Sequence, residues 1–344
     1  MKKYHVYGIG NALVDKEFQV EDSFFDEHNI EKGFMTLVSH EQQQQLLETL
    51  TNKVGITKKS GGGSAANTLY AISQFGGNAY FAGKVANDET GDFYVEQLGH
   101  HNIETNLGSN RDHGTTGRCL VMISPDAERT MHTYLGISEE VSVAEIDHEA
   151  IKDSEYVYIE GYLVTSASGK EAARELKRVA EEHGVKTAMT FSDPSMVEYF
   201  PEAVSEVIGT GVDLLFCNQQ EAMLWTDAED FSAACETLKQ QAKQFVITRG
   251  AEGALLYDGM NFIEIDSHNV DAVDTNGAGD MFAGAFMFAI THHHDFETAG
   301  KLASLAAATT VSSFGPRLSA EEHQKILEQQ GLANNLREFS DQEK

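Results

Sequence analysis

The stretch DTNGAGDMFAGAF, residues 274–286, places two aspartates around a glycine turn and follows them at once with an apolar run. The run from Met281 onward is typical of a buried helix, so residues 277–280 would form its first turn. N–H groups in a first turn have no partner inside the helix, and the helix dipole adds partial positive charge there. Glycine and alanine leave this backbone accessible. The stretch therefore predicts an anion hole made of main-chain groups.

Asp280 is the carboxylate inside this predicted turn. Its side chain could cap the helix, or it could accept a proton from a hydroxyl group that attacks a phosphorus atom. A lone glycine pair would favour capping alone. The full spacing of the stretch favours catalysis, and we interpret Asp280 as a general base.

The composition limits the classes of function. The 344 residues are 41% hydrophobic, which is enough for a large core in one domain, or in a large domain with a small one. With 54 acidic against 25 basic residues the formal net charge is −29, so we expect no nucleic-acid partner. No segment reaches the roughly 18 uninterrupted apolar residues of a membrane span, so we expect no membrane partner either.

The number and spacing of the cysteines indicate a reducing compartment. Cys119, Cys217 and Cys235 show no paired spacing, which is typical of a reducing environment. The first residues, MKKYHVYGIGNALVD, do not have the pattern of a signal peptide. We therefore expect a cytoplasmic protein.

From about residue 155 the sequence alternates between strand and helix patterns. Such alternation is typical of βαβ units and predicts an α/β fold with a central, mostly parallel sheet flanked by helices. The expected strands are 155–160, 187–191, 213–217 and 244–248, and the expected helices are 168–183, 202–209, 231–243, 276–290 and 297–313.

The first 140 residues have a different pattern. Segments 35–38 and 118–136 are typical of strands, whereas 65–76 is typical of a helix. The run QQQQ at 42–45 is interpreted as the solvated face of another helix.

These patterns suggest how the chain is divided. We expect one α/β domain over 1–330 that includes a discontinuous β-rich lid, assembled from about 16–40 and 112–138 and folded over one edge of the sheet. Residues 331–344 would form a polar C-terminal tail.

The stretch from Asp274 to Gly284 strongly resembles the C-terminal signature of the ribokinase-like (phosphofructokinase B) family, with seven consecutive positions plus Phe282 and Gly284. The resemblance implies a ribokinase-like α/β fold with Rossmann-type layering and a small β-rich lid. It also implies an ATP-dependent kinase. The family's base falls on Asp280, and its anion hole falls on Gly277, Ala278 and Gly279.

A second segment, GGGSAANTLYAISQFGGNAYFAGKVANDETG, resembles the family's N-terminal signature G-G-x-x-x-N. The match falls on Gly62, Gly63 and Asn67. Two glycines let a substrate lie against the backbone, and an asparagine can both donate to and accept from sugar hydroxyls. Alone, this run would also suit an ordinary turn between a strand and a helix.

Two further matches concern the nucleotide and its metal ion. FCNQQEA resembles the family's N-x-x-E element, with Asn218 and Glu221 on one helix face. The resemblance implies that this pair binds ATP and supports magnesium through water. ITRGAEGALLYDG is similar to the family's T-x-G-x-x-G segment near the nucleotide, on Thr248, Gly250 and Gly253, and a tight turn between strands would also explain it.

Other residues follow from the same resemblance. Arg129 matches a lid-side arginine that can meet the transferred phosphate, although a surface arginine paired with an acid is equally compatible. Asn276 is placed with the ATP-binding residues. Asp274, with main-chain carbonyls around 311–316, could hold a monovalent cation such as K⁺, as in many relatives.

The first loop favours one kind of substrate. In GIGNALVD, Asn11 and Asp15 are four residues apart, a spacing that looks like the adenosine kinase branch of the family. Asp15 could then accept hydrogen bonds from the ribose 2′- and 3′-hydroxyls, whereas a plain loop aspartate is the alternative. Candidates for contact with a nucleobase are Phe34, Met35, Met131 and Tyr134, each of which would also suit a core.

We therefore expect an ATP-dependent phosphotransferase that acts on the 5′-hydroxyl of an adenosine-like nucleoside, with ATP and Mg²⁺ as cofactors and K⁺ as a further candidate. The alternative within the family is a kinase for a free sugar such as ribose or fructose. We expect a small-molecule nucleoside or sugar as partner, and a monomer or a homodimer.

Two other classes fit the sequence poorly. An NAD-binding oxidoreductase is disfavoured because Leu13 replaces the third glycine after Gly8 and Gly10. A P-loop kinase is disfavoured because GGGSAANT lacks the lysine of that motif. The histidines at 292–294 point in different directions on a helix and do not predict a metal site.

Overall fold

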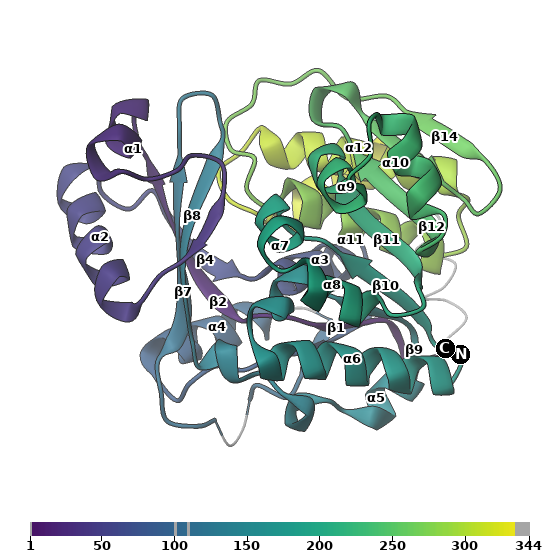
Figure 1. The fold of residues 1–344 in the computed structure, drawn as a ribbon, viewed down its shortest axis with the longest axis horizontal. Helices are drawn as coiled ribbons and strands as arrows, with labels where there is room; N and C mark the ends of the chain where they lie inside the picture. The colour runs from purple at the N-terminus through teal and green to yellow at the C-terminus, as the bar shows by residue number, and fades with distance from the viewer. Residues whose placement is uncertain (1, 100–101, 109–110, 334–344) are drawn as a thin grey trace.

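The computed structural model describes residues 2–99, 102–108 and 111–333. Its strands form a large sheet with helices on both faces and a small sheet at one side (Figure 1). Within the described residues no helix is both long and apolar enough to cross a membrane. The predicted tail at 331–344 lies mostly outside the described residues.

The large sheet has the order β14-β13-β12-β11-β10-β9-β1-β5-β6. The strands from β12 to β6 pair in parallel, and β13 and β14 add an antiparallel edge. This confirms the expected mostly parallel sheet. The strands are β1 (Tyr4–Ile9), β5 (Ala79–Ala82), β6 (Ile103–Thr105), β9 (Ser154–Ile159), β10 (Lys186–Thr190), β11 (Val212–Asn218), β12 (Ala242–Thr248), β13 (Ala254–Tyr257) and β14 (Phe262–Ile265).

Helices cover both faces of this sheet because neighbouring strand residues point to opposite sides. In β9, for example, Tyr158 packs in one core and Val157 in the other. The helices are α3 (Ser64–Gln74), α4 (Glu89–Leu98), α5 (His148–Lys152), α6 (Ala167–Glu182), α7 (Pro194–Tyr199), α8 (Pro201–Ile208), α9 (Gln219–Thr226), α10 (Phe231–Leu238), α11 (Ala278–Thr291), α12 (Phe296–Val311) and α13 (Ala320–Gln329), with short 3₁₀ turns η1 (Ile137–Glu140), η2 (Val143–Glu145), η3 (Gly161–Thr165) and η4 (Gly250–Glu252).

One expected boundary is wrong by several residues. The helix predicted over 231–243 ends at Leu238, and strand β12 begins at Ala242. The apolar face of the helix stops at Leu238, and Ala242 is already paired in register with Val212 of β11. The last residues that the sequence pattern assigned to the helix, 242 and 243, therefore belong to strand β12, because they pair with the neighbouring strand.

The small sheet has the order β3-β8-β7-β2-β4. Its strands are β2 (Leu13–Gln19), β3 (Met35–Leu37), β4 (Lys58–Gly62), β7 (Thr116–Ile123) and β8 (Arg129–Gly136). The segments expected to form the lid supply β3, β7, β8 and most of β2. The sequence pattern did not indicate β4, which pairs antiparallel with β2 and leads directly into α3.

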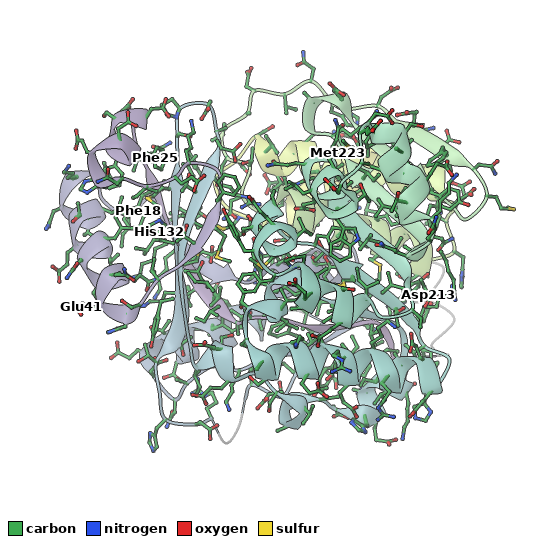
Figure 2. All side chains as sticks on the ribbon, in the orientation of Figure 1. Phe18, Phe25, Glu41, His132, Asp213 and Met223 are labelled. Atoms are coloured by element: carbon green, nitrogen blue, oxygen red, sulfur yellow. The ribbon has the colours of Figure 1, made fainter. Side chains whose placement is uncertain are left out.

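The outer face of the small sheet is covered by α1 (Asp22–His28) and α2 (His40–Lys53), as the purple helices in Figure 1 show. Phe18 of β2 is fully buried there, and Phe25 of α1 packs in the same cluster; Figure 2 labels both. The remaining buried members are Val20, Phe24, Leu50, Leu120 and Met122.

The glutamine run on α2 is not wholly solvated, contrary to the interpretation from sequence. Gln43 is fully buried, and its Nε2 donates to the carbonyl oxygens of Arg118 at 2.7 Å and His132 at 3.2 Å. These hydrogen bonds fasten α2 to β7 and β8. A glutamine that faces a sheet can satisfy main-chain carbonyls, which hydrophobic patterning does not reveal.

Candidate active site

A cavity of about 210 Å³ lies between the carboxyl ends of the large-sheet strands and the inner face of the small sheet. Crevices at this edge of an open α/β sheet are the usual ligand sites of such folds. The predicted residues that line the cavity are Asn11, Asp15, Gly63, Asn67, Arg129, Asn218, Glu221, Thr248, Asn276, Gly277, Gly279 and Asp280. The predicted residues outside its lining are Gly62, Ala278, Gly250, Gly253 and Asp274.

The expected anion hole is the first turn of α11, as the sequence predicted. Gly277 caps the helix in the left-handed region at φ 74°, and a Cβ there would lie 2.3 Å from Pro316 Cβ. Within the described part of the chain, the N–H groups of Gly279 and Asp280 have no acceptor. A Cβ at Gly279 would meet nothing within 4 Å, so the space in front of these donors is open.

Asp280 is held in place by two hydrogen bonds from α3. Ser64 Oγ donates to Oδ1 at 2.6 Å, and Asn67 Nδ2 donates to Oδ2 at 3.0 Å. Arg317 Nε in turn donates to Asn67 Oδ1 at 3.0 Å. Burial raises the pKa of Asp280, whereas these two hydrogen bonds and the charges of Arg129 and Arg317 oppose the rise.

The two signature segments meet because α3 and α11 pack closely. A Cβ at Gly284 would lie 2.6 Å from Ala71 Cβ and 2.6 Å from the Thr68 carbonyl oxygen. Only glycine allows this approach. Asn67 and Asp280, which are far apart in sequence, are therefore neighbours across the helix pair.

Asn11 follows β1 and is fixed by a buried glutamate. Its backbone N–H and its Nδ2 both donate to Glu160 Oε1, at 3.0 and 3.1 Å. The other carboxylate oxygen, Oε2, accepts from the Ala65 N–H at 2.8 Å. Burial raises the pKa of Glu160 to about 7, and these hydrogen bonds oppose the shift.

Asp15 lies on the inner face of the small sheet and is almost fully buried. None of the described residues donates a hydrogen bond to its carboxylate. Burial, with a smaller contribution from the nearby Glu17, raises its pKa to about 8, and Arg317 opposes this rise. A Cβ at Gly62 would lie 2.2 Å from Asp15 Oδ1, so Gly62 makes room for this side chain and does not line the cavity itself.

Glu17 is a second buried carboxylate on the same strand face. It is fully buried, and neither of its carboxylate oxygens has a hydrogen-bond partner among the described residues. Burial raises its pKa to about 7, and Asp274 adds to the shift. Asn276 lies near enough to favour the ionised form, but its Nδ2 makes no well-formed hydrogen bond.

Asn218 and Glu221 form a capping box at the start of α9. Asn218 Oδ1 accepts from the Glu221 N–H at 2.8 Å, and Glu221 accepts from the Asn218 N–H at 2.9 Å and from its Nδ2 at 3.0 Å. Burial raises the pKa of Glu221 to about 7. The pair is thus structural at the helix terminus and also faces the cavity.

Arg129 begins β8 and lines the cavity, with its side chain 24% exposed. Its Nη1 lies 3.7 Å from Oδ2 of Asp193, a residue that the sequence did not single out. Asp193 also caps α7 by accepting from the Ser195 N–H at 3.0 Å. Arg129 therefore both lines the cavity and lies near an acid, which fits a phosphate-binding role and an ion pair alike.

The backbone geometry explains three of the predicted residues, which are Gly253, Gly250 and Asp274. Gly253 lies in the turn from β12 to β13 at φ 85°, and a Cβ there would lie 2.0 Å from the Ile265 carbonyl oxygen. Gly250 begins η4 in the same turn, while Thr248 faces the cavity. Asp274 is fully buried beneath the anion hole and accepts backbone N–H groups from Asn276 and Gly315.

The apolar side of the cavity comes largely from the small sheet. Of the four candidates for contact with a nucleobase, Met35 and Met131 line the cavity, whereas Phe34 and Tyr134 do not. Tyr134 instead packs on His40, with 5.1 Å between ring centroids. The apolar lining is Leu13, Met35, Leu37, Cys119, Met131, Leu135, Phe216 and Phe282.

Sequence reasoning missed four polar residues that hold the site. Glu160 ends a predicted strand, and a charge at the carboxyl end of a buried strand could have drawn attention to it. Ser64 follows the glycine run directly. Arg317 and Lys58 carry no local signal, because only the fold brings them to the loops around Asp280 and Asp274.

Comparison with known proteins shows the family. The model of the pfkB family carbohydrate kinases matches residues 35–323, so the chain belongs to this family. A probable sugar kinase from Rhizobium etli is 30% identical, with a TM-score of 0.91 over 96% of this chain and 100% of that one. The adenosine kinase of Sinorhizobium meliloti is 33% identical, with a TM-score of 0.89 over 94% of this chain and 99% of that one. The adenosine kinase of Schizophyllum commune is 24% identical over 92% of this chain and 97% of the relative.

These similarities confirm the ribokinase-like fold and the class of reaction. The protein is an ATP-dependent kinase whose acceptor is an alcohol group. The relatives include both adenosine kinases and sugar kinases, so they do not decide whether the acceptor is a nucleoside or a sugar.

Proposed function

We propose that this kinase phosphorylates the 5′-hydroxyl of a nucleoside, with Asp280 as general base. The observation that carries the proposal is the pairing of an unsatisfied buried carboxylate, Asp15, with an apolar wall in one cavity. A ribose 2′,3′-diol would supply the hydrogen bonds that Asp15 lacks. A nucleobase would cover the apolar wall that includes Met35 and Met131, which a free sugar would leave exposed to water.

Asn11, Gly63 and Asn67 would complete the ribose site. Asn11 is oriented by Glu160, and a Cβ at Gly63 would lie only 2.0 Å from the Asn11 carbonyl oxygen. Because there is no room for a side chain at position 63, the backbone there is accessible from the cavity, and a sugar can lie against it. Asn67 would hold the sugar beside Asp280, to which it is hydrogen-bonded.

Asp280 would accept the proton of the 5′-hydroxyl as phosphoryl transfer proceeds. A carboxylate is a weak base for an alcohol, so the proton would move late, and positioning and charge stabilisation would dominate. The free N–H groups at the start of α11 would bind the oxygens of the transferred phosphoryl group. Arg129, which lines the cavity, would add a fixed positive charge there.

The residues present fit ATP and Mg²⁺. Asn218, Glu221, Thr248 and Asn276 line the side of the cavity next to the anion hole. Within the described ranges no group of three or more His, Cys, Asp or Glu residues could hold a metal directly. That arrangement suits Mg²⁺, which keeps several waters and binds chiefly to substrate phosphates, with Glu221 reached through water. When bound, Mg²⁺ neutralises charge on the phosphates.

We also propose that the small sheet acts as a lid and that the protein is a monomer. The inner face of the small sheet bounds the cavity, so its movement would exclude water from the reaction. Its outer face is already covered by α1 and α2, so it offers no open apolar face for a second copy.

The test is an ATP-consumption assay with adenosine, inosine, guanosine, ribose and fructose in the presence of Mg²⁺. Turnover on a nucleoside, with the product phosphorylated at the 5′ position by ³¹P NMR, would support the proposal. Turnover on a free sugar alone would refute the nucleoside assignment and leave the kinase chemistry in place.

The second candidate is a free-sugar kinase. It is favoured by the probable sugar kinase from Rhizobium etli, which matches this chain over nearly its whole length. A sugar would still engage Asp15 and Asn67, but it would leave the methionine side of the cavity unused.

A further inference from the structure

The acidic residue of the expected K⁺ site already has both of its carboxylate oxygens hydrogen-bonded. Asp274 is fully buried, and its two carboxylate oxygens each accept a backbone N–H at 2.8 Å, from Asn276 and Gly315. The Val311 carbonyl accepts two N–H groups, from Val273 at 2.8 Å and from Asp274 at 3.1 Å. Of the oxygens expected to hold K⁺ around 311–316, those of Asp274 and Val311 are therefore already engaged in hydrogen bonds.

A side chain with the charge of K⁺ already lies at this loop. Lys58, the first residue of β4, places its Nζ 2.5 Å from the Phe314 carbonyl oxygen. A Cβ at Gly315 would lie 2.4 Å from Lys58 Nζ, so the absence of a side chain at Gly315 gives the ammonium group its space. Gly315 adopts φ 90°, which strongly favours glycine.

The charge of Lys58 acts on the acids around it. Lys58 is paired in register with Glu17 across the two strands. Burial raises the pKa of Glu17 and of Asp274, and the Lys58 charge opposes both shifts. The ammonium thus offsets part of the negative charge that is buried beneath the anion hole.

The loop that Lys58 contacts is joined to the anion hole in two ways. The Gly315 N–H bonds to Asp274, whose other oxygen holds the Asn276 N–H. The next residue, Pro316, lies against Gly277, where there is no room for a Cβ. A group that fixes residues 314–316 therefore also fixes the first turn of α11.

We propose that the Lys58 ammonium replaces a monovalent cation in this kinase, so that the anion hole is positioned without added K⁺. A lysine carries one positive charge and three N–H donors on a tether, and it can neutralise and brace the loop as a bound ion would. Lys58 is a positioning residue, since it touches the supporting loop and not the reacting atoms. This inference needs only the kinase reaction and does not depend on which alcohol is the acceptor.

The first test measures kcat of the wild-type protein in KCl, NaCl and choline chloride at equal ionic strength. We expect the same kcat in all three salts, within about twofold. A wild-type enzyme that is activated by K⁺ over choline would overturn the proposal. This measurement needs no variant and so cannot fail through misfolding.

The second test uses Lys58→Gln, with Lys59→Gln as the matched control because Lys59 is exposed and lies over the Phe93 ring. In choline chloride Lys58→Gln should lose about tenfold or more in kcat, and KCl should restore much of that loss. Lys59→Gln should behave like the wild type in both salts. A Lys58→Gln loss that is equal in all salts would show a purely structural role and overturn the proposal.

The third measurement does not use activity. The melting temperature of Lys58→Gln should rise in KCl relative to choline chloride, because a vacated site can bind K⁺ in the folded state only. The wild type should show no such rise. If the expected K⁺ effects are absent while turnover persists, the inference that Lys58 replaces a monovalent cation is wrong, and the proposed function stands.

Discussion

Asp15 and Asp280, two carboxylates that line the cavity, differ in how they are held. Asp280 has both oxygens hydrogen-bonded, by Ser64 and Asn67. Asp15 receives no hydrogen bond from any residue that the structure describes, although it is more buried. The hydrogen bonds of Asp280 are therefore complete before a substrate arrives, whereas those of Asp15 are not.

This difference has a physical reason. A base must meet its hydroxyl in one geometry, so its orientation is worth fixing in advance. A binding carboxylate gains most when the ligand supplies its only hydrogen bonds, because a buried acceptor without a partner is costly. Burial raises the pKa of Asp15 to about 8, which reflects the cost of holding its charge without a hydrogen-bond donor.

The largest expected effect is that of Asp280→Asn. The amide keeps the shape of the side chain but cannot accept the hydroxyl proton, so kcat should fall by about a hundredfold or more. The melting temperature and the binding of ATP, measured by calorimetry, should change little. An unchanged kcat would remove Asp280 as the base.

Asp15→Ala should change the KM for the nucleoside and the KM for ATP to different extents. Loss of the diol contacts should raise the nucleoside KM by about tenfold or more, while the KM for ATP stays nearly constant. Steady-state kinetics with each substrate varied in turn gives both values. Equal increases in the two KM values would instead indicate that Asp15 has a folding role.

Glu17→Gln should change how stability depends on pH. Burial raises the pKa of Glu17 from 4.5 to about 7, so between these values the folded state holds a proton that the unfolded state has released. The free energy of unfolding therefore falls as pH rises through this range. From about pH 5 to about pH 8 the wild type should lose about 1–3 kcal/mol more than Glu17→Gln. Urea unfolding at several pH values measures this, and parallel curves for the two proteins would contradict the assignment.

The smallest expected effect is that of Arg317→Met on the pH profile of kcat. Asp280 must be ionised to act as a base, so activity falls as pH drops through its pKa. The Arg317 charge lowers that pKa, and its removal should therefore move the acidic limb to higher pH. A limb that stays in place would show that Arg317 supports only the packing around Asn67.

The sequence predicted those parts of the protein that depend on local spacing. The first turn of α11 was evident from DTNGAGD because a glycine cap and an apolar helix are both local features. The alternation after residue 155 likewise predicted the parallel sheet. The segments 35–38 and 118–136 indicated the small-sheet strands β3, β7 and β8, since strand patterns there are also local.

The parts that could not be predicted depend on residues distant in sequence. Strand β4 carries the letters KKSGG, which do not alternate, and only its pairing with β2 makes it a strand. Lys58 reaches a loop some 256 positions later in the chain. Gln43 satisfies carbonyls on two other strands, and no periodicity in its own helix indicates such a bond.

The close contact of Gly284 with α3 has a mechanical consequence. It makes Asn67 and Asp280 parts of one rigid piece, whereas Asp15 belongs to the small sheet, which joins α3 through Gly63 at φ 92°. Rotation at that hinge would change the span from Asp15 to Asp280 and leave the span from Asn67 to Asp280 fixed. If Asp15 binds the acceptor and Asp280 is the base, as proposed, the distance between them would select which hydroxyl of a substrate reaches the phosphoryl group.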